Sequence, residues 1–190
     1  RAPPPLKRFD FTPPLWRDRR AIEGSPNGPR GRTAVKLAAI GADPWFVEAL
    51  RSMISGQGTD AGRTNGAGGF ALALVVPDGA AFVAHPAARD IDIAIVACNA
   101  AESESPRVIG WAKRHAPGVR VVVKHPALRP DLVRNAIQHG AWGAFTPDDP
   151  PETVLGMLRS VAQGRVSFPF VDFTTLRDDP FERLTRREAE

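Results

Sequence analysis

Short apolar runs rich in β-branched residues alternate along this chain with stretches of helical periodicity. IDIAIVA at 91–97 and VRVVVKH at 119–125 have the length and continuity of strands buried on both faces. In ADPWFVEALRSMIS at 42–55, apolar residues instead recur every three or four positions, as on one face of a helix. Because parallel neighbours need a crossover connection, this alternation predicts a parallel sheet whose strands are joined by helices.

The whole pattern contains five strands and five helices with short connections. It predicts an α/β fold of the flavodoxin-like kind, in which a five-stranded parallel sheet lies between two helical layers. The expected strands are 33–41, 70–76, 91–97, 119–125 and 141–145, and the expected helices are 42–55, 78–89, 105–116, 129–140 and 150–164.

The chain of 190 residues divides into three parts by composition. Residues 1–32 hold seven of the 19 Pro and carry eight Lys and Arg against three Asp and Glu, which indicates a Pro-rich basic arm. Residues 33–164 contain twelve of each charge and form the expected domain. Residues 165–190 are expected to be a linker followed by the start of another domain.

Aromatic side chains recur in the arm at Phe9, Phe11 and Trp16. A purely solvated tail has little use for such residues, so we expect them to anchor the arm on its own domain or on a second subunit. The alternatives are a solvated basic tail and an arm whose basic cluster, WRDRR at 16–20, contacts nucleic acid.

A glycine-rich segment at 56–69, GQGTDAGRTNGAGG, could be taken for a phosphate-binding loop. It follows a helix and precedes a strand, whereas phosphate loops run from a strand into a helix, and it lacks the Gly-Lys-Ser/Thr ending. We therefore interpret it as a flexible connector.

The distribution of apolar residues and cysteine points to a cytoplasmic protein. No apolar stretch is long enough to cross a bilayer, and RAPPPLKRFD has no signal core, so no membrane association is expected. The single Cys98 cannot form an internal disulfide; it is interpreted as a small core residue, with thiol sensing as the alternative.

No metal site is expected, because the four His residues lack ligand spacing: His85, His115, His125 and His139.

Two segments resemble bacterial response regulators of the LuxR/FixJ class. VKLAAIGADPWFVEALRSMI at 35–54 is similar to the first strand and helix of a receiver domain. HPALRPDLVRNAIQHGAWGAFTPDDPPETVLGMLRSVAQG at 125–164 is similar to its last third. Independently, LTRREAE at 184–190 resembles the start of a LuxR-type helix-turn-helix, and Thr185 and Glu188 have the spacing of a capping box.

The resemblance implies a phosphorylation pocket, but the residues it requires are replaced. Receivers use an acidic pair after the first strand, an Asp phosphoacceptor after the third, a Ser or Thr after the fourth and a Lys after the fifth. The positions that match are Gly41 and Ala42 with Asp43 one step late, Ala97, Lys124 or His125, and Pro147. Without a second carboxylate, a nucleophile or the Lys, phosphoryl transfer by the usual route is not expected.

The class also implies a face for self-association, formed by the fourth helix, the fifth strand and the fifth helix. The residues assigned to this dimer or partner face are Trp142, Phe145, Val154 and Leu158, with packing as an equal alternative for the aromatic pair. DNA contact is expected through a C-terminal domain that lies largely beyond these residues.

These observations predict a degenerate receiver domain of a transcription factor that is regulated without aspartyl phosphorylation and without a cofactor. It would act as a homodimer, or by binding a sensor protein or a small-molecule ligand. The alternatives are a stand-alone adaptor for a sensor protein and a small flavodoxin-like enzyme. The enzyme has little support, because only Asp43, Lys124 and His125 converge near the strand ends.

Overall fold

The computed structural model describes residues 34–56, 69–97, 104–127 and 129–169. Strands and helices alternate through these residues as the sequence predicts. The strands are β1 (Ala34–Ile40), β2 (Gly69–Val76), β3 (Ile93–Ala97), β4 (Arg120–Lys124) and β5 (Gly143–Phe145). The helices are α2 (Pro44–Ser55), α3 (Gly79–Ala84), α4 (Glu104–His115), α5 (Pro130–His139) and α6 (Pro151–Ala162), with a 3-10 helix at Pro86–Asp90.

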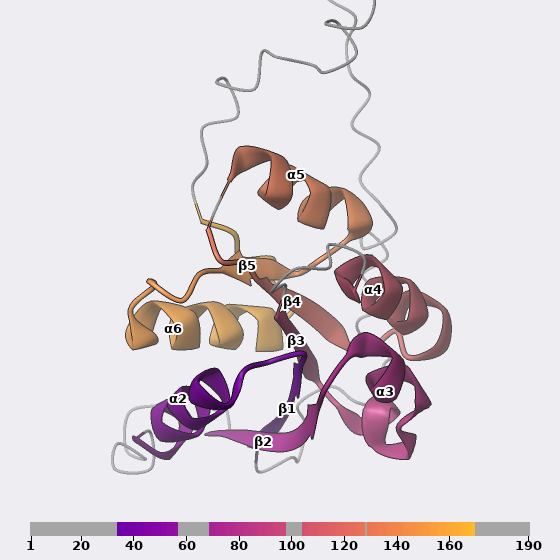
Figure 1. Ribbon diagram of the computed structural model, residues 1–190, viewed down its shortest axis with the longest axis horizontal. Helices are drawn as coiled ribbons and strands as arrows, with labels where there is room; N and C mark the ends of the chain where they lie inside the picture. Colours follow the sequence, from indigo (N-terminus) through magenta and orange to yellow (C-terminus); the bar gives the residue numbers. More distant parts are fainter. Residues whose placement is uncertain (1–33, 57–68, 98–103, 128, 170–190) are drawn as a thin grey trace, which may run out of the picture.

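All five strands pair in one parallel sheet, in the order β2-β1-β3-β4-β5 (Figure 1). The strand order reverses direction at β1, so β1 and β3 end side by side at the carboxyl edge of the sheet. The register places Ala97 opposite Lys124 and Lys124 opposite Phe145. In open α/β sheets this edge is where ligands and chemistry gather.

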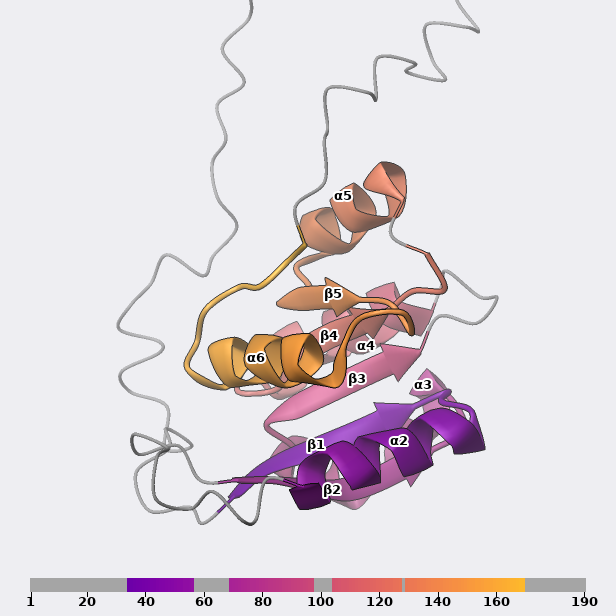
Figure 2. The same cartoon turned by 90° about the vertical axis from the view of Figure 1, so that its left-hand side faces the viewer.

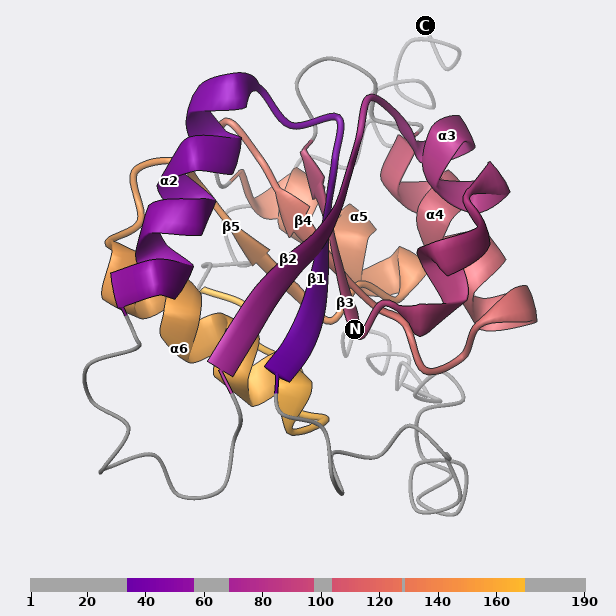
Figure 3. The ribbon, with the colours of Figure 1, turned by 90° about the horizontal axis from the view of Figure 1, so that it is seen from below.

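Helices cover both faces of the sheet, which gives the three expected layers (Figures 1 and 2). α2 and α6 pack on one face against a cluster that includes Leu37, Ile95 and Leu158. α3, α4 and α5 cover the other face, where Phe82 meets the ring of Trp111 edge-on at a centroid distance of 5.5 Å. The flavodoxin-like fold is therefore confirmed, and its view from below shows the two helical layers on either side of the twisted strands (Figure 3).

The helix ends follow from local chemistry. The carboxylates of Asp43 and Asp78 accept hydrogen bonds from backbone N–H groups in the first turns of α2 and α3, which are otherwise unsatisfied. α5 ends at Gly140, whose φ of 92° is left-handed and costs glycine little. The single helix expected over 78–89 is instead divided, because Pro86 cannot continue α3 and begins the 3-10 helix.

The chain does not leave the domain at Gly164, where the sequence placed the start of a linker. Residues 165–169 turn back along the outer edge of β5. The Ser167 N–H donates to the Trp142 carbonyl at 2.8 Å, and Gly143 and Ser167 form a parallel bridge. Phe168 packs against the core on the α3–α4–α5 side.

Several expectations fall outside the described residues. These are the arm at 1–32 with its anchors, Cys98, the capping-box pair Thr185 and Glu188, and all but the ends of the glycine-rich connector. Within the described ranges, no helix combines the length and apolar character needed to span a membrane.

The buried ring of Phe82 provides a test of this packing. Phe82 is fully buried, so Phe82→Ala should leave a cavity beneath Trp111 and lower the free energy of unfolding by about 3–5 kcal/mol. Denaturant unfolding measures the change, and Val75→Ala is the control, because Val75 is 43% exposed and should change stability by less than about 0.5 kcal/mol. Equal effects of the two substitutions would contradict the packing described.

Candidate functional site at the carboxyl edge of the sheet

The residues expected at the pocket do lie at the carboxyl edge of the sheet. Asp43 follows β1 and begins α2, Ala97 ends β3, and Lys124 ends β4. Their side chains meet in part: the Lys124 ammonium lies 3.2 Å from a carboxylate oxygen of Asp43, although the two residues are 81 positions apart. The edge of the sheet thus holds an ion pair that joins β4 to α2.

The two partners of this ion pair differ in their exposure. The Lys124 side chain is only 8% exposed, whereas Asp43 is 42% exposed. The ammonium also lies 4.5 Å from the centroid of the Phe46 ring, a cation–π geometry. Phe46 in turn packs on Phe145, at a centroid distance of 6.0 Å. Lys124 is therefore held between a carboxylate and an aromatic face, where few water molecules can reach it.

Asp43 has two tasks in this arrangement. One carboxylate oxygen accepts the Phe46 N–H at 2.8 Å and caps α2, while the other faces Lys124. The pKa of Asp43 is lowered from its ordinary value of 3.8, first by the Phe46 N–H and then by Lys124, although partial burial opposes the shift. The carboxylate stays ionised at neutral pH, and both of its oxygens are engaged.

One position of the expected acidic pair, Gly41, cannot easily accept an acidic residue. Gly41 has a left-handed φ of 64°, and a Cβ placed there would lie 3.3 Å from the Ala97 carbonyl oxygen and 3.6 Å from that of Pro77. A side chain at this position would be strained as well as crowded. Ala42 and Ala97 provide only methyl groups. The vacated pocket expected from the sequence stays a prediction, which these features support.

The chain after β5 provides no cation at this edge. Pro147 is exposed, and the preceding residue, Thr146, is buried. The Thr146 backbone N–H and hydroxyl both donate to one carboxylate oxygen of Asp149, at 2.7 and 3.2 Å. The Thr146 hydroxyl is thus used to shape the turn into α6.

The donor set does not fit the Mg²⁺ on which phosphorylating receivers depend. Mg²⁺ requires several oxygen ligands in octahedral geometry. Asp43 already binds Lys124 and the N-terminus of α2, and Asp149 binds Thr146. Among the described residues, no group of three or more His, Cys, Asp or Glu is placed to hold a metal ion. The ammonium of Lys124 is instead the positive charge at this edge.

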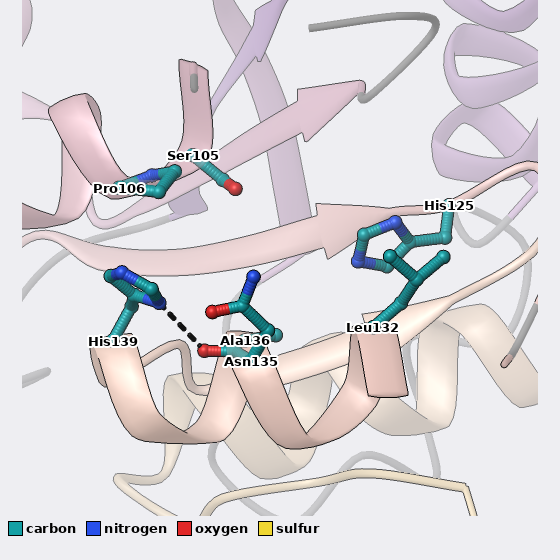
Figure 4. A pocket seen from close by; sticks show the side chains of 7 residues that line it. All are labelled: Ser105, Pro106, His125, Leu132, Asn135, Ala136 and His139. Atoms are coloured by element: carbon teal, nitrogen blue, oxygen red, sulfur yellow. Dashed lines mark hydrogen bonds between the residues drawn. The ribbon is translucent and has the colours of Figure 1, made fainter. Parts of the chain in front are cut away.

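His125 lies on the opposite side of β4 from Lys124. Its side chain is 6% exposed and lines a small open pocket between α4 and α5 (Figure 4). His139 also lines this pocket, where its ring contacts the Asn135 carbonyl at 2.8 Å. The sheet therefore separates His125 from the Asp43–Lys124 pair, and the three titratable residues do not form one site.

Three of the four residues assigned to the dimer or partner face are in the core. Phe145 and Val154 are each 3% exposed and Leu158 is fully buried, so these side chains cannot present to a partner. The assignment of these three was wrong because β5 and α6 turn them toward α2 and the sheet. Trp142 is half-buried and stacks under the Arg120 guanidinium, 5.3 Å from its ring centroid.

Sequence reasoning missed two residues of this site. Phe46 was interpreted only as part of the apolar face of its helix, yet its ring forms one wall around Lys124. Its position three residues after the N-cap Asp43 was the available signal, since that spacing puts the first helical turn beside the capping carboxylate. The contact between Asp149 and Thr146 was also missed, because two polar residues three positions apart in a connection form no distinctive pattern.

A known regulator and several solved structures are similar to this chain. The chain is 29% identical over 123 residues to the probable transcriptional regulatory protein SgaR of Hyphomicrobium methylovorum. The match covers 65% of this chain and 58% of SgaR, so it spans little more than half of that protein. No protein-family model matches the sequence.

Two receiver domains illustrate the structural similarity. The signal receiver domain of the putative response regulator NarL from Mycobacterium tuberculosis has a TM-score of 0.57 at 20% identity, with 70% of this chain and all of that chain covered. The receiver domain of RcsB from Salmonella enterica serovar Typhimurium has a TM-score of 0.57 at 13% identity, covering 73% and 94%. At these identities the likeness shows the receiver fold.

The unequal burial of Asp43 and Lys124 predicts unequal effects of removing each. Asp43→Asn keeps a helix cap but leaves a buried ammonium without its counter-charge, so it should lower the free energy of unfolding by about 1–3 kcal/mol. Lys124→Met leaves a carboxylate that water can reach, and should change stability by less than about 1 kcal/mol. Denaturant unfolding at pH 7 compares them, and Glu48→Gln in the exposed Glu48–Arg51 pair is the neutral control. A larger loss of stability in Lys124→Met than in Asp43→Asn would contradict the unequal burial of the two side chains.

The lowered pKa of Asp43 predicts how this stabilisation depends on pH. A carboxyl group whose pKa is lower in the folded state stabilises the fold above its unfolded pKa, and that contribution is lost as pH falls through the folded pKa. The stability advantage of the parent chain over Asp43→Asn should be constant above about pH 5 and shrink as pH falls below 3.8. Denaturant unfolding curves of the parent chain and Asp43→Asn, measured across this pH range, give the difference in their free energies of unfolding. A stability advantage of the parent chain that grows as the pH falls would refute the prediction.

Proposed function

We propose that this chain contains the regulatory domain of a response-regulator-type transcription factor, and that the domain works without phosphorylation of an aspartate. The receiver fold and the similarity to a probable transcriptional regulatory protein support the general class. The observation that supports independence from phosphorylation is the ion pair of Lys124 and Asp43, which engages the carboxylate next to the positions where the acidic pair was expected.

The chemistry of phosphoryl transfer explains why this pair matters. The reaction needs a nucleophile, a divalent cation near the incoming phosphoryl group and a group that neutralises the product. Ala97 provides no nucleophile, the donor set does not fit Mg²⁺, and Pro147 has no charge to offer. Lys124 already satisfies Asp43, so a cation does not have to bind to relieve repulsion at this edge.

The proposal includes DNA binding and dimerisation because a structurally similar protein binds DNA as a dimer. One RcsB structure, which has a TM-score of 0.55 to this chain at 13% identity and of which 64% is covered, contains two RcsB dimers bound to two parallel DNAs. We infer that this chain also acts as a homodimer, with DNA contacted by a helix-turn-helix that begins near Thr185 and Glu188. The basic arm at 1–32 would dock on the domain or on the second subunit.

The regulating input would be a sensor protein or a small molecule that favours one association state. A cytoplasmic location fits this role. Catalysis is disfavoured, because the titratable groups at the carboxyl edge pair with each other and His125 lies across the sheet.

A stand-alone adaptor that docks on a sensor protein is the second possibility, and one observation favours it. Trp45, in the first turn of α2 beside Asp43, is 86% exposed. A large aromatic side chain in this position suits a protein interface. If the adaptor reading applies, DNA binding should be undetectable in the longest natural form of the chain, whereas Trp45→Ala should weaken capture of the sensor.

Phosphorylation can be tested directly by intact-mass measurement after incubation with Mg²⁺ and acetyl phosphate. The parent chain should remain unmodified, and so should Ala97→Asp, because a restored nucleophile still lacks the second carboxylate and the Lys. A receiver domain known to accept phosphate from acetyl phosphate serves as the positive control. A stoichiometric phosphate adduct on the parent chain would end the proposal.

A further inference from the structure

We propose that residues 165–169 are a strap that closes the free edge of β5, and that this edge is a self-association surface for a second copy of the chain. The inference rests on the proposed function in one respect, because it identifies the face through which the proposed homodimer would form. It also accounts for the failure of Phe145, Val154 and Leu158 as partner residues, since the available surface is the edge of the strand and not those side chains.

The strap is held at its start and at its middle. At its start, Gly164 takes a left-handed φ of 80° and the Arg165 N–H donates to the Ser160 carbonyl at 2.9 Å, which turns the chain back from α6. Further along, the Ser167 N–H donates to the Trp142 carbonyl at 2.8 Å. Arg120 braces the same corner, because its guanidinium stacks on Trp142 and donates to the Ala162 carbonyl at 3.3 Å.

Close backbone approach at Gly143 is what allows the strap to reach β5. A Cβ on Gly143 would lie 2.7 Å from the Ser167 carbonyl oxygen and 2.9 Å from the Met157 sulfur. Any other residue at this position would push the strap away from the strand. Gly143 thus sets the distance at which a second backbone can lie against the edge.

Fewer contacts keep the strap on the domain than keep the helices on the sheet. In the described part of the chain, it is joined to the β5 edge by one hydrogen bond to Trp142 and one bridge to Gly143, and Phe168 packs against the core, while Val166 remains 53% exposed. A single hydrogen bond contributes about 0.5–1.5 kcal/mol to stability. A strap held this way can open without unfolding the domain.

An opened β5 would suit a second copy of itself. Its backbone groups would become an unpaired edge, which is a template for pairing with another strand. In a two-fold dimer the two copies of the strand lie side by side, with residue i of one facing residue j of the other and the reverse, so like charges on so short a strand would lie close and repel one another. β5 reads Gly-Ala-Phe and has no charged residue, so two copies can meet there without that repulsion.

Proline at position 167 tests the strap, because it removes the N–H that donates to Trp142. The experiment compares the full chain with Ser167→Pro and with Ser167→Ala, which keeps this backbone donor. Light scattering over a concentration series gives the dimer dissociation constant, and hydrogen exchange over 164–169 reports whether the strap has opened. We expect faster exchange and a dissociation constant lowered about tenfold in Ser167→Pro, and no change in Ser167→Ala.

Gly143→Ala is a second variant that opens the strap by crowding Ser167 and leaves its N–H in place. It should also accelerate exchange and strengthen association. If exchange accelerates in either variant while association is unchanged or weaker, the edge of β5 is not a self-association surface. If exchange accelerates in neither, these contacts do not hold the strap, and the proposal fails. Neither result bears on phosphorylation, which the intact-mass experiment decides separately.

Discussion

Burial of the central strand on both faces is the constraint on which the rest of the structure depends. Every residue of β3, from Ile93 to Ala97, is buried, so helices must cover both sides of the sheet. The two apolar clusters that do this draw on residues from every helix of the described chain. Once the layers are set, the ends of β1, β3 and β4 converge at one edge, and the identity of the residues there decides what the domain can do.

At that edge, two of the residues that match a receiver's phosphorylation pocket are joined by an internal electrostatic contact. A pocket of several carboxylates must bind a cation to relieve their repulsion, whereas Asp43 is satisfied by Lys124 from within the chain. The aromatic wall of Phe46 and the engaged hydroxyl of Thr146 leave little polar capacity unused. Under the proposed function, regulation of the domain would act through its surfaces.

The surface at β5 offers a physical route for that regulation. The strap bridges to Gly143 at the start of β5, and Phe145 at the end of the same strand packs on Phe46 beside the ion pair. The pocket and the exit of the chain from the domain are therefore joined by β4 and β5. This proximity is a structural fact, and a coupling between the two would have to be measured by double-mutant cycles.

The sequence by itself determined the order of the elements and the parallel sheet, because buried strands and helical periodicity are properties of local sequence. Its prediction of a vacated phosphorylation pocket rests on the functional groups that the matching positions lack, and it stays a prediction. The sequence could not determine that Lys124 reaches Asp43 across 81 positions, that His125 faces the other layer, or that Phe145 and Leu158 are internal. It also placed 165–169 in a linker, since one hydrogen bond and one close approach at Gly143 leave no periodic pattern. These features depend on which strands become neighbours and on the way each side chain turns, and only tertiary packing decides both.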